Sequence, residues 1–519
     1  MLSTPNQLLC DLLIIGGGIN GVAIARDAAG RGLSVVLCEK DDLASHTSSA
    51  STKLIHGGLR YLEHHEFGLV RKSLIEREIL MRSAPHLISP MQFVMPHDAG
   101  MRPLWMIRAG LFLYDHLARR EVLSGSSAVQ LQTHTAGLPL KAHFARGFIY
   151  SDGWVDDARL VVVNAIDAAQ KGARILTRTR CESGLRQGDR WLVGLRTAAG
   201  QRIDVSARAV VNAAGPWAAL FLQTVVHRPA SKPLRLIKGS HIVVRALFVH
   251  PYAYLFQHPD KRVVFAIPYE RDFTLIGTTD LDYQGSLDDV VIEADEISYL
   301  CELVNRYFLK PIAPSDVVWS YSGVRPLVDD TNADSLSASA VTRDYRFELD
   351  QEGAPLLSIF GGKITTSRVL AEEVIDLVGP LLSHRGNAWT AHACLPGGAI
   401  TGSAPNNRAV TEFDHYLQHK QRHYHWLDPL LVARYVKAYG TCVDQLLAGR
   451  DSVAAMGEEI APTLFAAEVM YLIDREWAVS ASDILWRRSK LGLHLPPETA
   501  AVLERWIAAN VNVNNICQH

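Results

Sequence analysis

The sequence predicts a mixed α/β (α+β) fold, and three stretches of the 519-residue chain carry that prediction. Residues 8–39 have the pattern of a strand, a glycine turn, a helix and a second strand. Residues 234–281 alternate in the manner of antiparallel strands, and helical patterns dominate residues 407–509. We therefore expect a nucleotide-binding domain, a β-rich domain and a helical C-terminal domain.

Length and composition are those of a globular protein with more than one domain. The chain is 48% hydrophobic and 20% charged, and its net charge of −2 gives no sign of a nucleic-acid partner. Its seven cysteines are scattered without C-x-x-C or metal-ligand spacing, which predicts a reduced compartment, no disulfide and no metal site. The sequence contains neither a basic leader nor an apolar run of about 18 residues, so we expect no signal peptide and no membrane span.

The first stretch predicts a Rossmann-like dinucleotide-binding unit. Leu12 to Ile15 form an apolar run without polar alternation, as in a strand covered on both faces. Gly16, Gly18 and Gly21 then give G-x-G-x-x-G, which provides a tight turn, close approach to a pyrophosphate and close helix packing. The helix that follows aims its N-terminal N–H groups at this turn. We assign to cofactor binding Gly16, Gly17, Gly18, Ile19, Asn20 and Gly21.

Glu39 ends the second strand, close to the spacing of about 20 residues at which an acid binds a ribose hydroxyl. Its charge would repel a 2′-phosphate, which disfavours NADP. A turn whose glycines serve packing alone is the alternative.

A hydroxyl-rich loop and a glycine pair follow Glu39. Hydroxyl donors and glycines next to a dinucleotide turn can wrap ribose and phosphates, although a solvated surface loop has the same composition. Further cofactor-binding residues are predicted at Thr47, Ser48, Ser49, Leu54, Gly57 and Gly58.

Residues Met101 to Arg120 predict an amphipathic helix with basic ends around an aromatic, apolar middle. This pattern suits a helix that lies in a membrane interface, and it suits equally a helix packed within a large domain.

A second glycine turn lies far along the chain. Residues 356–368 read as a strand, the pair Gly361–Gly362 and the start of a helix, and the strand at 205–214 closes on a glycine turn as well. Two such anion- or carbonyl-binding turns imply one long ligand held by both ends of the chain, such as a flavin dinucleotide. To it we assign Gly215, Trp217, Gly361, Gly362, Lys363, Ile364 and Thr365.

These segments predict the domain organisation. Residues 1–395 form an oxidoreductase region, in which a discontinuous cofactor domain carries an inserted substrate-binding β domain at roughly 60–150 and 220–350. Residues 396–519 form a helical C-terminal domain with a structural or interaction role.

Nine motifs in order resemble one family, the aerobic FAD-dependent glycerol-3-phosphate dehydrogenases of the glycine and D-amino-acid oxidase fold group. The motifs are IIGGGINGVAIARDAAGRGLSVVLCE, TSSASTKLIHGGLRYLEH, WVDDARLV, NAAGPW, RLIKGSHIVV, IGTTD, YSGVRPL, TRDY and FGGKITT. His46 departs from the small residue that this resemblance leads us to expect at its position.

The resemblance implies bound FAD and the oxidation of sn-glycerol 3-phosphate at C2 to dihydroxyacetone phosphate. A hydride would pass from C2 to flavin N5 and electrons then to a membrane quinone. It also implies a homodimeric peripheral membrane protein at the cytoplasmic face of the cell membrane. The alternatives are a flavin amine or amino-acid oxidase, a glycerol-3-phosphate oxidase that makes hydrogen peroxide, and a flavin-containing scaffold without catalysis.

The resemblance also implies substrate-site residues. Arg60, Arg325 and Arg343 match the arginines that would clamp a phosphate through bidentate forks, whereas surface salt bridges are the ordinary alternative. Tyr61 and Thr366 would complete the pocket with hydroxyl groups.

The base that accepts the C2 hydroxyl proton has two candidates. His241 is favoured because an unperturbed imidazole pKa near 6.5 allows proton uptake at neutral pH. Lys363 is the rival, either as a base with a depressed pKa or as the cation that holds the flavin N1–C2=O edge. With Arg325 these are the predicted catalytic residues.

Overall fold

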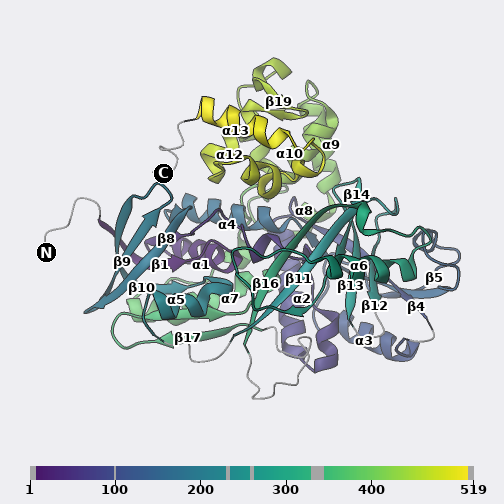
Figure 1. Ribbon diagram of the computed structural model, residues 1–519, viewed down its shortest axis with the longest axis horizontal. Coiled ribbons are helices and arrows are strands. Elements are labelled where there is room, and N and C mark those ends of the chain that lie inside the picture. The colour runs from purple at the N-terminus through teal and green to yellow at the C-terminus, as the bar shows by residue number, and fades with distance from the viewer. Residues whose placement is uncertain (1–6, 99–100, 229–233, 258–261, 329–343, 512–519) are drawn as a thin grey trace.

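The computed structural model describes residues 7–98, 101–228, 234–257, 262–328 and 344–511. Two β-sheets lie beside one another, and a mostly helical region, coloured yellow-green, covers one end of both (Figure 1). The predicted mixed α/β fold is confirmed.

The first sheet has eight strands in the order β17-β18-β10-β1-β2-β7, with β9 paired to β10 and β8 to β9. Strands β18, β10, β1, β2 and β7 are parallel, as a strand–helix–strand unit requires. The bounds are β1 (Gln7–Ile15), β2 (Val35–Cys38), β7 (Arg174–Leu176), β8 (Thr179–Gln187), β9 (Arg190–Thr197), β10 (Arg202–Asn212), β17 (Arg346–Asp350) and β18 (Leu356–Phe360).

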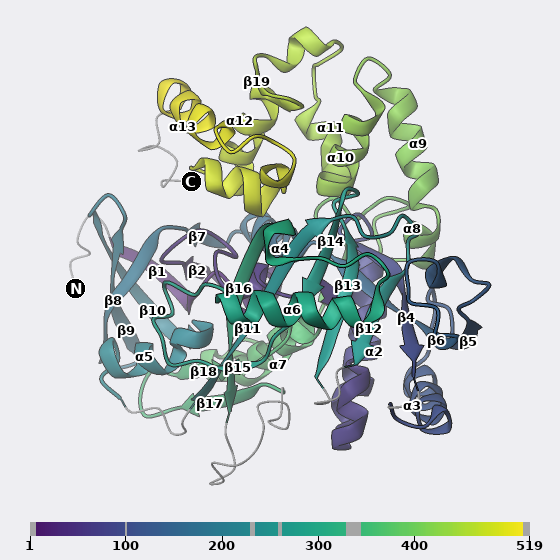
Figure 2. The same cartoon turned by 45° about the vertical axis from the view of Figure 1, so that its right-hand side comes forward.

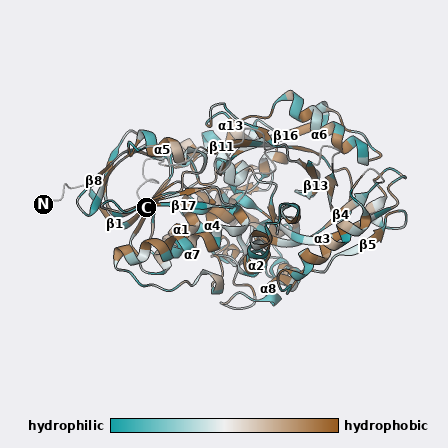
Figure 3. Cartoon of the chain, turned by 90° about the horizontal axis from the view of Figure 1, so that it is seen from below, coloured by the Kyte–Doolittle hydropathy of each residue, from teal (hydrophilic) through white to brown (hydrophobic). Residues whose placement is uncertain are grey.

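Both faces of this sheet are covered, which explains the uninterrupted apolar run in β1. Leu12 and Ile14 pack against one layer of helices, and Leu13 and Ile15 join a second core with strands β8 to β10 and a short helix. The helical layer is largely brown, meaning hydrophobic, in Figure 3. Its helices are α1 (Ile19–Gly30), α4 (Asp157–Gln170) and α7 (Ser367–Val378), and the short helix is α5 (Ala218–Thr224).

The second sheet has ten strands in the order β15-β11-β14-β13-β12-β4-β6-β3, with β16 paired to β11 and β5 to β6. It is antiparallel as predicted, apart from one parallel pair, β4 with β12. The bounds are β3 (Leu54–Ile55), β4 (Ile88–His97), β5 (Ser127–Gln130), β6 (Arg146–Val155), β11 (Leu234–Arg245), β12 (Ala253–Gln257), β13 (Val263–Tyr269), β14 (Phe273–Gly277), β15 (Leu281–Asp282) and β16 (Val317–Val328).

Helices cover the two faces of this sheet unequally. Helix α6 (Ala294–Tyr307) packs on one face, and α2 (Phe67–Ser83) and α3 (Leu104–His116) share a core with the other. Helix α3 lies on the side away from the N-terminus in the turned view (Figure 2).

The C-terminal region has a hydrophobic core of its own. Its elements are α8 (Asn407–Thr411), α9 (Phe413–His423), α10 (Pro429–Tyr439), α11 (Val443–Leu446), β19 (Glu459–Ala461), β20 (Leu464–Phe465), α12 (Ala466–Glu476), a π-helical segment (Asp483–Arg488) and α13 (Thr499–Asn510). The domain boundary at 395/396 stays a prediction. Among the helices of the described residues, none has the length and apolar character needed to cross a bilayer.

Candidate functional site

A cavity of about 430 Å³ lies where the two sheets meet. Its walls combine the first glycine turn, the hydroxyl-rich loop, the glycine turn after β10, strands β11 and β16, and the second glycine turn. Segments that are far apart in the sequence therefore share one site.

The first glycine turn admits no side chain at two of its positions. A Cβ on Gly16, whose φ is +111°, would lie 2.6 Å from the Ala213 carbonyl oxygen. A Cβ on Gly21 would lie 1.9 Å from the Gly16 oxygen, where helix and strand approach. The helix start therefore lies close to the strand ends and presents bare backbone to the cavity.

The Glu39 carboxylate braces this turn. Its Oε2 accepts a hydrogen bond of 2.7 Å from the Gly17 N–H, and its Oε1 accepts one of 2.9 Å from the Asp41 N–H. Burial raises the pKa of Glu39, although these backbone donors oppose the rise. The predicted ribose contact would use the same carboxylate at the cavity wall.

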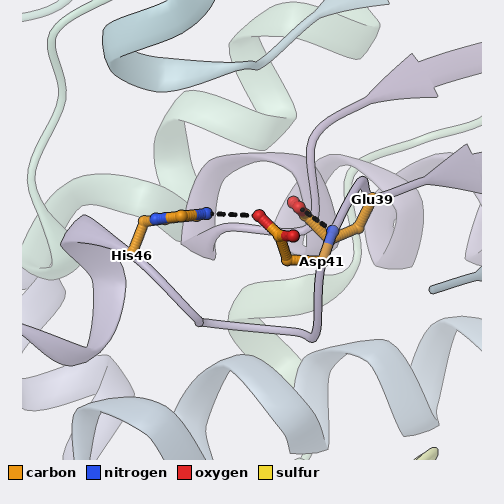
Figure 4. Close-up of side chains that lie close together, drawn as sticks. All are labelled: Glu39, Asp41 and His46. Atoms are coloured by element: carbon orange, nitrogen blue, oxygen red, sulfur yellow. Dashed lines mark hydrogen bonds and ion pairs between the residues drawn. The ribbon is translucent and has the colours of Figure 1, made fainter. Parts of the chain in front are cut away.

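His46 has a structural place in the loop after Glu39. Its Nε2 lies 2.7 Å from Asp41 Oδ2 (Figure 4), and its ring lies 4.5 Å from that of Trp217, centroid to centroid. The ligand atoms of Glu39, Asp41 and His46 lie within 4.8 Å of one another. The bonds to backbone and between the residues use these atoms, so we assign the cluster to bracing the loop.

The hydroxyl-rich loop is tied to its surroundings. Thr47 Oγ1 donates 2.7 Å to the Val324 carbonyl of β16, and Ser48 Oγ accepts 2.9 Å from the Ile19 N–H at the start of α1. Ser49 Oγ donates 3.2 Å to the His46 carbonyl. The loop is therefore held by hydrogen bonds to β16 and to the start of α1, and it is not the solvated surface loop of the alternative interpretation.

The two glycine turns lie side by side, as the idea of one long ligand requires. Asn20 Nδ2 donates 3.3 Å to the Gly361 carbonyl, across 341 residues of sequence. Gly361 and Gly362 have φ values of +80° and +100°, which favour glycine. Lys363 follows, with its Nζ 3.7 Å from the centroid of the Tyr61 ring.

Strands β11 and β16 place His241 and Arg325 on one face of the second sheet. His241 pairs with Tyr321, Gly239 with Gly323 and Ile237 with Arg325, so the two functional side chains flank an opposed pair of glycines. A Cβ on Gly239 would lie 2.3 Å from an Arg325 guanidinium nitrogen. The two glycines thus make room for the Arg325 guanidinium and for Ala50 between a candidate base and a candidate cation.

His241 is buried and neutral. Its Nε2 lies 3.0 Å from Thr52 Oγ1, and its ring stacks on Tyr321 at a centroid distance of 4.8 Å. Nδ1 has no hydrogen-bond partner among the described residues. Burial, with the charges of Lys53 and Arg325, lowers the pKa of His241 well below 6.5, so the unperturbed value assumed from the sequence does not hold.

Two predicted arginines meet at one carboxylate. An Arg325 guanidinium nitrogen lies 3.0 Å from Asp280 Oδ1, and one of Arg60 lies 4.0 Å from Oδ2. Guanidinium groups are donors that can bind a phosphate or a carboxylate through two parallel hydrogen bonds. The third, Arg343, falls outside the described residues.

Most predicted site residues line this cavity, and their binding roles stay predictions. Those in its wall are Gly16, Gly18, Ile19, Asn20, Glu39, Thr47, Ser48, Leu54, Tyr61, Gly215, Trp217, His241, Arg325, Gly361, Gly362, Lys363, Ile364 and Thr365. Those that do not form the wall are Gly17, Gly21, Ser49, Gly57, Gly58, Arg60 and Thr366. Gly57 instead donates its N–H to Tyr114 Oη at 2.8 Å, which shapes the chain before Arg60.

Sequence reasoning missed the partners of the key side chains. Thr52, Tyr321 and Asp280 contact His241 or the arginines, and the sequence assigned none of them to these contacts. Glycines inside the strand patterns KGSHIVV and YSGVRPL were a usable signal, because a strand glycine marks close approach of a ligand or backbone.

The residues present fit a flavin dinucleotide. One cavity contains a glycine turn at a helix start for a pyrophosphate, a carboxylate at the end of the second strand, a second glycine turn beside a lysine and the strand glycines Gly239 and Gly323.

Comparisons with known proteins give the same answer. The family described as FAD dependent oxidoreductase matches residues 11–368, and the C-terminal domain of alpha-glycerophosphate oxidase matches residues 388–511. A glycerol-3-phosphate dehydrogenase of Pseudomonas aeruginosa is 50% identical over 507 residues, covering 97% of this chain and 96% of the relative. A D-erythritol 1-phosphate dehydrogenase of Brucella abortus is 48% identical, covering 96% of this chain and 97% of the relative.

The fold matches a solved relative over nearly its whole length. The glycerol-3-phosphate dehydrogenase of Bacillus halodurans, solved in complex with FAD, superposes with a TM-score of 0.76 at 28% identity, covering 97% of this chain and 91% of that one. The chain therefore belongs to the FAD-dependent oxidoreductases, with FAD as its cofactor, within the group that contains the glycerol-3-phosphate dehydrogenases.

Proposed function

We propose that the chain oxidises sn-glycerol 3-phosphate at C2 to dihydroxyacetone phosphate and delivers the electrons to a membrane quinone. The observation that carries the proposal is the face shared by β11 and β16, where His241 and Arg325 line one cavity on either side of Gly239 and Gly323. A polyol phosphate between them would offer its hydroxyl to one side chain and its phosphate to the other.

FAD, when bound, supplies a two-electron acceptor for the hydride of C2. His241 supplies the proton acceptor, because its lowered pKa leaves the ring neutral at pH 7. The Thr52 hydroxyl at 3.0 Å fixes the ring, and the tautomer it selects decides which nitrogen accepts the proton. Lys363 remains the rival base, and its position over Tyr61 equally suits a cation that binds the FAD ring edge.

Arg325 and Arg60 supply the phosphate clamp. Both guanidinium groups already face the Asp280 carboxylate, so a phosphate dianion would compete with that carboxylate for the same donors. Three predicted cations support a phosphate rather than a carboxylate substrate, for which one arginine suffices.

The Brucella relative supports one alternative of the same class. It is a D-erythritol 1-phosphate dehydrogenase, and it is nearly as similar to this chain as the Pseudomonas relative. Glycerol 3-phosphate and D-erythritol 1-phosphate both join a phosphate to a chain of hydroxyl carbons, so the clamp fits both and the length of the pocket decides between them.

Helix α3 supports the proposed membrane contact. Its inner face, with Leu111 and Tyr114, is buried, whereas Trp105 and Phe112 are 69% and 60% exposed. Arg102 and Arg120 at its ends pair with Glu63 and Asp115, so their charges are partly compensated. An exposed aromatic face on an amphipathic helix suits the headgroup boundary of a bilayer. The cytoplasmic side and the homodimer stay predictions.

The test uses the full chain loaded with FAD under anaerobic conditions. Glycerol 3-phosphate should bleach the flavin absorbance near 450 nm, and a quinone analogue should restore it faster than oxygen does. Stronger bleaching by D-erythritol 1-phosphate would reassign the substrate. Bleaching by glycine, sarcosine or D-alanine but by neither phosphate, with release of hydrogen peroxide, would overturn the proposal.

A further inference from the structure

A buried salt-bridge network joins the C-terminal region to the loop that borders the FAD cavity. Arg488, on the π-helical segment Asp483–Arg488, is 0% exposed in its side chain and donates to both carboxylate oxygens of Asp42 at 2.6 and 2.9 Å. Arg487 Nε donates to the same carboxylate at 2.6 Å. Asp42 is 3% exposed and lies three residues after Glu39, in the loop whose residues line the cavity.

A second carboxylate closes the network. Asp483 receives hydrogen bonds from Arg487 and from Arg178, which lies between β7 and β8 of the first sheet. Burial opposes the charge on Asp483, yet the three neighbouring arginines lower its pKa to about 2. Both carboxylates and all three guanidinium groups are therefore placed to act as one charged unit.

The same segment reaches a second wall of the cavity through stacked rings. Trp486 stacks on Trp319 at a centroid distance of 4.6 Å, and Trp319 lies 5.0 Å from Tyr321. Tyr321 in turn stacks on His241 at 4.8 Å. A continuous row of rings thus runs from the C-terminal region to the cavity.

Domain adhesion alone does not explain the choice of residues. A buried ion pair is weak evidence for stability, because the cost of desolvating its charges offsets most of the attraction, and apolar side chains would join the domains as well. Bidentate arginines differ in that they fix the direction of the carboxylate they hold.

We propose that the segment Asp483–Arg488 positions the FAD site: Arg487 and Arg488 set the loop through Asp42, and Trp486 sets the wall that carries His241. These are positioning residues, since each acts through a residue of the oxidoreductase region. The proposal concerns FAD binding and does not depend on which substrate is oxidised.

The first test measures the dissociation constant of FAD by flavin fluorescence on folded full-length protein. Arg488→Met should raise it at least tenfold, because it leaves the Asp42 carboxylate underpaired. The double variant Arg488→Met with Asp42→Asn should recover part of that loss. Arg487→Met leaves both hydrogen bonds of Arg488 intact and should raise the FAD dissociation constant by a smaller factor. This variant replaces Arg488→Met in the test if Arg488→Met does not fold.

The matched control is Arg434→Met. Arg434 makes a similar fork, 2.6 and 2.7 Å, with Glu468 inside the C-terminal region. This variant should lower the melting temperature and leave the FAD dissociation constant unchanged. If Arg434→Met weakened FAD binding as much as Arg487→Met or Arg488→Met does, the proposed positioning of the loop through Asp42 would be overturned.

The second test uses visible circular dichroism of bound FAD, which reports the surroundings of the flavin ring. Trp486→Ala should change the spectrum and Trp486→Phe should restore it, because phenylalanine keeps a ring against Trp319. Identical spectra for wild type and Trp486→Ala would overturn the role of the stack.

Discussion

At His241, burial opposes the very charge that a base acquires when it accepts a proton. Lys53 and Arg325 add positive charge nearby, and together these effects lower the imidazole pKa. A phosphate dianion at the arginines would supply the compensating negative charge. Substrate binding and proton uptake are therefore expected to favour one another at this residue.

Arg325→Ala should raise KM for glycerol 3-phosphate by about 100-fold, since it removes a charged donor from the phosphate site. FAD binding should change little, and steady-state kinetics with a dye acceptor would measure the effect. Arg196→Ala, which breaks an exposed pair with Glu182, is the control. An unchanged KM would exclude Arg325 from phosphate binding.

His86 offers a test of acid stability. It is buried with neither ring nitrogen bonded among the described residues, and burial lowers its pKa to about 3. Between about pH 6.5 and 3 the unfolded chain binds the extra proton, so acid lowers the free energy of unfolding by up to about 1.4 kcal/mol per pH unit. His86→Leu should remove that contribution.

Urea unfolding at several pH values would measure the difference. The free energy of unfolding above pH 7 can differ between the two proteins. Between pH 6 and 4, however, it should fall less steeply with pH in His86→Leu than in wild type. Gln418→Leu, at an exposed position without a titratable group, should leave the slope as it is. Parallel slopes for wild type and His86→Leu would contradict the buried neutral assignment.

At the scale of elements, the site depends on which strands lie next to one another. The first glycine unit was predictable because its parts are local: strand, turn, helix and second strand occur within residues 8–39. The pairing of β11 with β16 was not, because it joins residues about 80 apart and is decided by packing. The same limit hid the partners Thr52, Asp280 and Tyr321.

The close approach of β16 to the loop after Glu39 predicts the effect of Gly323→Ala. The new Cβ would lie 2.7 Å from the Ala50 Cβ in the cofactor loop, so FAD should bind at least tenfold more weakly. Gly68→Ala is the control, because its Cβ meets nothing within 4 Å and alanine favours helix α2. Fluorescence titration with FAD compares Gly323→Ala with Gly68→Ala. Equal FAD affinities of the two variants would contradict a close contact between Gly323 and Ala50.

At the scale of the whole molecule, the C-terminal region could be predicted as a unit, but its contact with the oxidoreductase region could not. The helices of residues 407–510 and their separate hydrophobic core could be predicted from the sequence, because helical patterns dominate this region. Its engagement with the cofactor loop could not, because Arg487 and Arg488 look like ordinary surface cations until the chain folds back on Asp42.

The exposed face of α3 predicts how the whole molecule meets a bilayer. Replacing Trp105 and Phe112 with serine should reduce binding to vesicles that contain anionic lipid by at least fivefold, without loss of FAD. Vesicle co-sedimentation measures this. Leu138→Ser, at another exposed apolar position, is the control. Equal retention of all three proteins on vesicles would exclude α3 from the contact.

The hydrogen bond between Asn20 and Gly361 has a consequence for biosynthesis. Strand β18 enters the first sheet beside β10, so the second glycine turn reaches the first only after some 360 residues have left the ribosome. The loop at Asp42 gains its hydrogen bonds from Arg488 later still, because Arg488 is synthesised after the second glycine turn. We therefore expect the coenzyme to bind late in synthesis, so that truncated translation products emerge colourless.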